Sequence, residues 1–153
     1  MSPAPADFFI RYDWTAGPLP PPWHWEFTIE IMARGAGQIA VLPDYPSPKV
    51  RAWTEQFAVH PFHIDWIYGV LTDNHLFDAD WARRGQNRIG GGAEWMVVHA
   101  DGRKIDVPSS PPEHLAAATA AMCGSVRALV PDRLWESLTA KREKYVRKFR
   151  PPR

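Results

Sequence analysis

The side chains best suited to chemistry lie on an alternating stretch between Trp23 and Met32. Side chains on a strand point alternately to opposite faces, so His24, Glu26, Thr28 and Glu30 share one face, about 7 Å apart at each step of two residues. A histidine and two carboxylates on a rigid sheet suit acid–base catalysis or a divalent metal. The catalytic candidates are therefore His24, Glu26 and Glu30. The alternative is a solvated polar sheet face, on which such residues are common.

A second candidate is the segment His60-Pro-Phe-His63-Ile-Asp65. Two histidines three residues apart can share a helix face, which makes His60 and His63 the candidate metal ligands. However, Asp65 projects about 160° away from His63 around a helix that turns 100° per residue. His60 also falls at the helix cap, and no HExxH pattern is present. The alternative is an ordinary surface helix start, and the sequence predicts no cofactor.

Basic residues beside a glycine-rich loop suggest anion binding. Arg83, Arg84 and Arg88 lie in or near the segment that ends with Gly90-Gly91-Gly92. Phosphate-binding loops have a helix directly behind them, whereas a strand is expected here, and no Gly-Lys-Ser/Thr completes a P-loop. The alternative is a flexible loop or a β-bulge.

The C-terminal stretch is strongly basic although the whole chain has a net charge of only +1. Residues 141–153 hold seven Lys and Arg and one acid, Glu143. Such a tail can bind an anionic surface, or it can be the solvated face of a last helix. Nucleic acid is not the expected partner, because most Trp and Phe fall at inward positions. The anion-binding candidates here are Lys141, Arg142, Lys144, Arg147 and Lys148.

The helix expected after Pro61 carries more apolar residues than one core contact needs. Its core stripe, at i, i+3, i+4 and i+7, consists of Ile64, Ile67, Tyr68 and Leu71. A second apolar line, Phe62, Trp66 and Val70, lies on another side of the helix. It predicts a surface for another protein or for a second copy of the chain, since aromatic residues are enriched at interfaces. The alternative is packing under the adjacent segment 76–81.

The single cysteine, Cys123, limits the redox and metal chemistry of the chain. One thiol cannot form an internal disulfide, and zinc sites built on cysteine pairs are excluded. Cys123 falls inside a predicted helix, away from a helix start or a neighbouring histidine, so a structural thiol is expected. No signal peptide and no apolar run of membrane-spanning length is visible, which predicts a cytoplasmic protein.

Periodicity and turn residues predict the elements that hold these side chains. With 45% hydrophobic and 23% charged residues, the 153-residue chain is expected to be one globular domain, with loose ends at 1–7 and 150–153. We predict an α+β fold: an antiparallel, meander-like sheet of about five or six strands with helices packed on one face. Strands are expected at 8–14, 23–32, 38–42, 49–59, 93–99 and 103–107, and helices at 61–72, 111–129 and 131–149.

These patterns favour a small soluble domain that binds a protein and has no catalytic role. This expectation rests on the lack of a complete catalytic or cofactor motif, and these motifs identify no family. The first alternative is a small metal-dependent or acid–base enzyme that uses the polar face of 23–32. The second is nucleic-acid or anionic-surface binding by the basic C-terminal helix.

Overall fold

The computed structural model describes residues 1–86 and 91–149. Over these residues the chain forms strands, α-helices and one short 3-10 turn, η1 (Glu113–Leu115). The strands are β1 (Phe9–Thr15), β2 (Glu26–Met32), β3 (Ala36–Leu42), β4 (Trp53–Ala58), β5 (Ala93–Ala100) and β6 (Arg103–Val107). The helices are α1 (Pro61–Asp73), α2 (Ala116–Arg127) and α3 (Asp132–Phe149).

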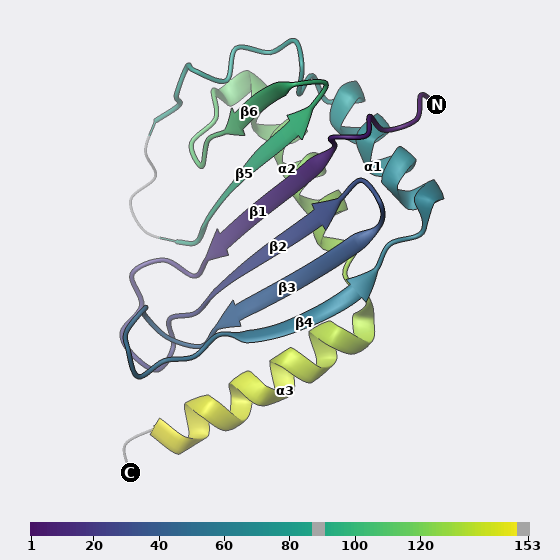
Figure 1. Ribbon diagram of the computed structural model, residues 1–153. Helices are drawn as coiled ribbons and strands as arrows, with labels where there is room; N and C mark the ends of the chain where they lie inside the picture. The colour runs from purple at the N-terminus through teal and green to yellow at the C-terminus, as the bar shows by residue number, and fades with distance from the viewer. Residues whose placement is uncertain (87–90, 150–153) are drawn as a thin grey trace.

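The six strands form one sheet in the order β4-β3-β2-β1-β5-β6, and each neighbouring pair is antiparallel. The first four strands are a meander. The chain then passes through α1 and returns on the other side of β1, where β5 and β6 form a hairpin (Figure 1). The predicted α+β class and antiparallel sheet are confirmed. β1 is therefore one of the two central strands, and it joins the meander to the hairpin.

The helices cover one face of the sheet, and the other face is open to the viewer in Figure 1. Tyr68 of α1 contacts Phe8 edge-on, with ring centroids 5.4 Å apart, and α2 passes behind the centre of the sheet. Trp135 of α3 meets Phe27 edge-on at 5.1 Å. Farther along α3, Tyr145 lies 6.2 Å from the ring of Trp53 on β4. The core thus lies between a single sheet and a single layer of helices.

The alternation in 23–32 predicts the two faces of β2 correctly. Phe27, Ile29 and Ile31 are buried under the helices, and burial of each such side chain stabilises the fold by about 1.5–3 kcal/mol. Trp23 differs, because its side chain is 42% exposed. The backbone N–H of Trp23 donates to the carbonyl of Pro20, so the chain is still turning there, and the strand begins only at Glu26.

The helix starts show how local chemistry sets boundaries. Pro61 occupies the start of α1, and the imidazole Nδ1 of His60 accepts the N–H of Phe62 at 3.1 Å. The helix predicted at 111–129 begins later in the structure: no side chain caps α2, and it follows η1 at Ala116. Pro112 has φ of −53° and ψ of 148°, an extended conformation, so the first helical turn begins after it, at Glu113.

The N-terminal segment, predicted to be loose, makes specific contacts. The N–H of Ala4 donates to Asp65 on α1 at 2.9 Å. The carboxylate of Asp7 accepts the N–H of Asp101 at 2.8 Å and that of Gly102 at 2.7 Å, in the turn between β5 and β6. The bond from Gly102, followed by that from Asp101, holds the pKa of Asp7 below its ordinary value. The segment thus joins the hairpin to the rest of the sheet. Within 1–86 and 91–149, no helix combines the length and apolarity needed to cross a bilayer.

Replacing Asp7 with Asn tests this clamp through its pH dependence. A carboxyl whose pKa is lowered by folding contributes stability above its unfolded pKa, about 4, and loses it as the pH falls through the folded pKa. The stability difference between wild type and Asp7→Asn should therefore be largest above about pH 5 and should shrink towards about pH 2. Urea midpoints of both proteins across this range measure it. A difference independent of pH would show that the Asp7 carboxylate is not the stabilising group.

Candidate functional site

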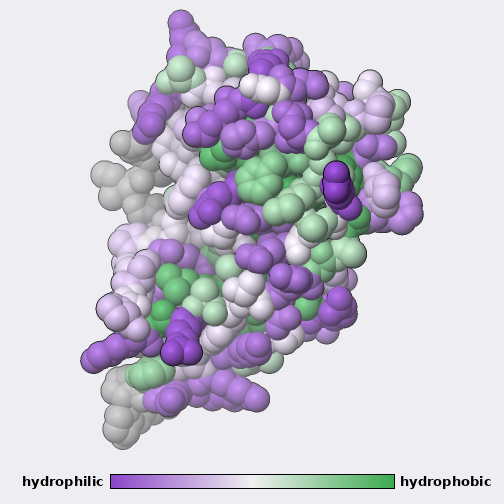
Figure 2. All heavy atoms as spheres, viewed as in Figure 1, coloured by the Kyte–Doolittle hydropathy of each residue, from purple (hydrophilic) through white to green (hydrophobic). Residues whose placement is uncertain are grey.

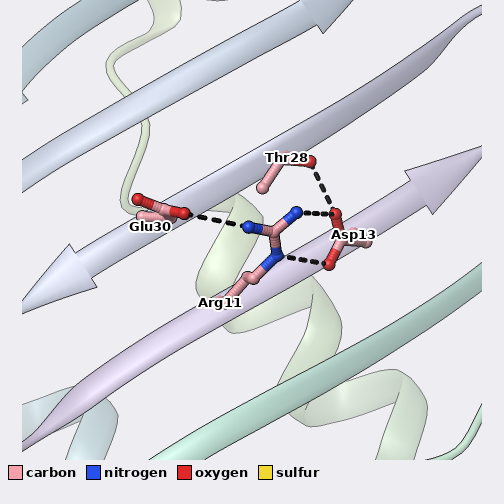
Figure 3. A network of polar contacts seen from close by, with 4 residues as sticks. All are labelled: Arg11, Asp13, Thr28 and Glu30. Atoms are coloured by element: carbon pink, nitrogen blue, oxygen red, sulfur yellow. Dashed lines mark hydrogen bonds and ion pairs between the residues drawn. The ribbon is translucent and has the colours of Figure 1, made fainter. Parts of the chain in front are cut away.

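A polar network lies on the open face, across β1 and β2 (Figure 3). The register places Arg11 opposite Glu30 and Asp13 opposite Thr28. The guanidinium of Arg11 donates to both oxygens of Asp13, at 3.1 and 3.3 Å, and to Oε1 of Glu30 at 3.2 Å. The hydroxyl of Thr28 donates to Asp13 Oδ1 at 2.6 Å. The pKa of Arg11 is raised, chiefly by the hydrogen bond to Asp13.

The charged groups of this network are paired with one another. Asp13 accepts three hydrogen bonds, and the carboxylate of Glu30 is paired with the same guanidinium. Such pairs at a surface typically stabilise a protein by less than about 1 kcal/mol. Figure 2 shows hydrophilic side chains over much of this face, with a hydrophobic area over β1 and β5. The network is therefore best understood as part of the pairing between β1 and β2.

The structure brings His24 and Glu26 together and places Glu30 apart from them. His24 lies before β2 and is only 3% exposed; its Nδ1 is 2.6 Å from the carbonyl oxygen of Gly17, and its Nε2 is 2.9 Å from Oε1 of Glu26. The ring of Tyr45 stacks on it, with centroids 3.8 Å apart and planes 5° apart. Glu30 is bound to Arg11 instead. His24 thus joins two loops to the strand, in a position that a substrate would not reach without displacing Tyr45.

Removing the His24 ring should destabilise the protein. His24→Ala deletes a buried ring and two hydrogen bonds, and leaves the Gly17 carbonyl without its partner, which we expect to cost about 2–4 kcal/mol in the free energy of unfolding. The matched control is His75→Asn, because His75 also contacts a carboxylate, that of Asp78, but its side chain is 63% exposed, and asparagine tolerates the backbone φ of +65° at this position. The control should change stability by less than about 0.5 kcal/mol. Urea denaturation measures both, and equal effects would contradict the proposed role of His24.

A pocket of about 370 Å³ lies at the start of α1. The end of β4, the first turns of α1 and the segment after α2 supply its walls. Its lining consists of Ala58, Val59, His60, Phe62, His63, Trp66, Ala128 and Leu129. Phe62 is 58% exposed, whereas Trp66 is partly buried against the core. We call this site the α1 pocket.

The α1 pocket unites residues that the sequence places in two separate predictions. Phe62 and Trp66 come from the predicted partner surface, and His60 and His63 from the predicted metal pair. Val70, one turn beyond Trp66, packs against the core and does not line the pocket.

The histidines of the α1 pocket are placed as parts of its wall. The ring of His60 accepts the N–H of Phe62 as the helix cap, and its centroid is 6.3 Å from that of His63 in an edge-on arrangement. Among residues 1–86 and 91–149, no group of three or more His, Cys, Asp and Glu is arranged to hold a metal ion.

The basic candidates before β5 have different surroundings. Arg83 forms an ion pair with Asp80 at 3.5 Å. Arg84 lines a larger pocket, of about 620 Å³, between the segment after α1 and the edge strand β6. Arg88 and the first glycine of the predicted loop, Gly90, lie outside the described residues.

The basic side chains of α3 are partly engaged in contacts within the fold. Lys141 pairs with Glu55 at 3.6 Å. The guanidinium of Arg142 lies 4.7 Å from the centroid of the Trp25 ring and donates to the carbonyl of Trp23 at 3.0 Å. Burial lowers the pKa of Arg142. Lys148 lies over the ring of Phe149, at 5.5 Å. Lys144 and Arg147 are on the same helix. Arg142 therefore anchors α3 to the chain before β2.

Sequence reasoning missed a polar cluster beneath the helices. The hydroxyl of Tyr12 donates to Oε2 of Glu94, and Nη1 of Arg127 donates to both of these oxygens at 3.0 Å. Burial, with a further contribution from Glu94, raises the pKa of Tyr12. Cys123 is fully buried nearby, and burial raises its pKa to about 12, which disfavours the thiolate that a nucleophile requires. In the sequence, the sign of this cluster is that Glu94 falls on the same strand face as the apolar Met96.

No protein-family model matches this sequence, and no curated protein shows a match to it. The function is therefore argued from the surfaces of the molecule.

Proposed function

We propose that the protein is a non-enzymatic binding module that docks a partner protein at the α1 pocket. The observation that carries this proposal is the placement of Phe62. This large apolar side chain is 58% exposed and stands at an apolar pocket whose other walls include Trp66 and Leu129. An exposed aromatic residue beside a preformed cavity is the arrangement found at interface hot spots.

The chemistry of the α1 pocket indicates what it takes. Its walls are largely hydrocarbon and aromatic, from Val59, Phe62, Trp66 and Leu129, and the polar lining groups are the imidazoles of His60 and His63. A volume of about 370 Å³ is near the lower end of the range for small-molecule sites, and suits one or two apolar side chains. We therefore expect a partner segment that presents a Leu, Met or aromatic anchor to the pocket.

The rigidity of the surroundings also supports docking. Val59 donates its N–H to the carbonyl of Gly35 at 2.7 Å, which fixes the chain as it leaves β4. Gly35 has φ of +89°, and a side chain there would lie 2.3 Å from the Val59 carbonyl oxygen, so the close approach requires glycine. A preformed pocket loses little conformational entropy on binding.

The alternatives have less support from the same contacts. An acid–base enzyme that used His24 would need an accessible ring, yet this ring is buried under Tyr45. Binding of nucleic acid by α3 would rest mainly on Lys144, Arg147 and Lys148, because Lys141 pairs with Glu55 and Arg142 lies over Trp25. In contrast, Phe62 and the pocket beside it face solvent.

A display selection from a library of random peptides tests the proposal. Peptides are selected on the wild-type protein, and their affinities are then measured on Phe62→Glu. Binders should carry a large apolar anchor and should lose about tenfold or more in affinity, because the substitution places a charge at the pocket. Sedimentation of the same variants tests whether a second copy of the chain is the partner.

The matched control is Phe149→Glu. Phe149 is also an exposed phenylalanine on a helix, at 52%, but it lies on α3 and not at the α1 pocket. Both variants should keep the wild-type urea midpoint to within a small shift. Selected peptides and self-association that respond equally to the two substitutions, or to neither, would overturn the proposal.

A further inference from the structure

The larger pocket, of about 620 Å³, lies along the edge strand β6, at the opposite edge of the sheet from β4. One wall is the segment 76–84, which follows α1, and the other is the β5–β6 hairpin. Trp95 of β5, which is exposed, and Ile105 of β6 both contribute to the lining. We call this site the β6 pocket.

The segment beside β6 is fixed at both ends. At one end, Arg103 donates to the carbonyl of Phe77 at 2.8 Å, with its guanidinium 5.5 Å from the centre of the Phe77 ring. At the other end, Gly85 donates its N–H to the carbonyl of Ser110 at 2.8 Å. Between them, Trp81 is buried and donates its indole N–H to the carbonyl of Leu76. The β6 pocket is therefore preformed.

The contacts of Arg103 and Gly85 also limit the kind of molecule that can enter the β6 pocket. An extended peptide that adds a strand to a sheet needs an edge that is open along its length. Here the contacts of Arg103 and Gly85 join the neighbouring segment to the hairpin at the start of β6 and just after its end. A compact molecule enters such a space more easily than an extended chain, and about 620 Å³ is typical of small-molecule sites.

The charges of the lining favour an anion. Its basic side chains are Arg84, Arg103 and Lys104, and its acids are Asp80 and Asp106. Asp80 pairs with Arg83 at 3.5 Å, and Asp106 with Lys104 at 3.8 Å. Arg103 contacts a neutral carbonyl and a ring. Within 1–86 and 91–149, Arg84 forms no ion pair. Arg84 thus keeps its charge available for a ligand at the end of the pocket where Gly85 bonds to Ser110, whereas Arg103 is held on Phe77 at the other end.

We propose that the β6 pocket binds a small amphipathic anion, with an aromatic or apolar body and one carboxylate, sulfonate or phosphate group. The body packs against Trp95, which lies just beyond the end of β6 because Met96 pairs with Val107, and the acidic group pairs with Arg84 at that same end. Guanidinium groups suit this role because they bind oxyanions through two parallel hydrogen bonds. This site is separate from the α1 pocket and does not depend on the function proposed for it.

A matched pair of fluorescent probes tests the proposal. The first is 8-anilinonaphthalene-1-sulfonate, an aromatic anion, and the second is N-phenyl-1-naphthylamine, which has the same rings without the charge. The sulfonate should bind saturably at one site, and Arg84→Gln should weaken it by about fivefold or more. The neutral probe should be insensitive to this substitution. Trp95→Ala should weaken both probes, because both place their rings at this side chain.

Arg83→Gln is the control, since Arg83 is the neighbouring arginine and does not line the β6 pocket. It should leave the affinity for the sulfonate unchanged. Phe62→Glu, which alters the α1 pocket, should also leave it unchanged. Equal losses in Arg84→Gln and Arg83→Gln, or binding abolished by Phe62→Glu instead, would overturn the assignment. Unchanged urea midpoints establish that the variants remain folded.

Discussion

The hydrogen-bonded register of β1 is the constraint on which the rest of the structure depends. This strand pairs with β2 on one side and with β5 on the other, so it sets the faces of both halves of the sheet. In this register Ile10 and Tyr12 are fully buried under the helices, while Arg11 and Asp13 point to the open face. A slip of one residue would exchange these sets and place two charges in the core. The paired charges on β1 and β2 therefore support the same register that the apolar residues require.

Both pockets follow from this two-sided sheet with a single helical layer. Helices on one face leave gaps where one helix begins and another ends, and the α1 pocket occupies such a place, beside the segment that follows α2. The second pocket lies at the edge strand β6. An uncovered strand edge can pair with other chains, so such an edge is commonly covered. The segment 76–85 runs beside this edge and is bonded to the hairpin at both ends, which leaves a pocket between them.

The sequence predicts local structure better than it predicts the pockets. Alternation gives the buried face of β2, and proline and glycine mark most turns, because these effects act within a few residues. The position of β5 beside β1 depends on contacts between distant segments, as does the ion pair between Glu94 and Arg127. The α1 pocket likewise joins Ala58 to Leu129. An excess of apolar residues on one helix predicts a role for Phe62 and Trp66, whereas Trp95 alternates like any strand residue and carries no such signal.

The contacts of the polar residues bear on the kind of function that the molecule can support. Acid–base chemistry needs side chains whose hydrogen-bonding capacity is directed at a substrate. Here the ring of His24 is hydrogen-bonded to Gly17 and Glu26. The carboxylate of Asp13 is hydrogen-bonded to Arg11 and Thr28. Over residues 1–86 and 91–149, the side chains whose capacity is not used in this way include exposed aromatic rings beside pockets and the guanidinium group of Arg84 at one of them. Such groups contribute to binding through burial of apolar area and through charge, and they need no proton transfer. This distribution is the physical basis of the proposal that the protein binds other molecules.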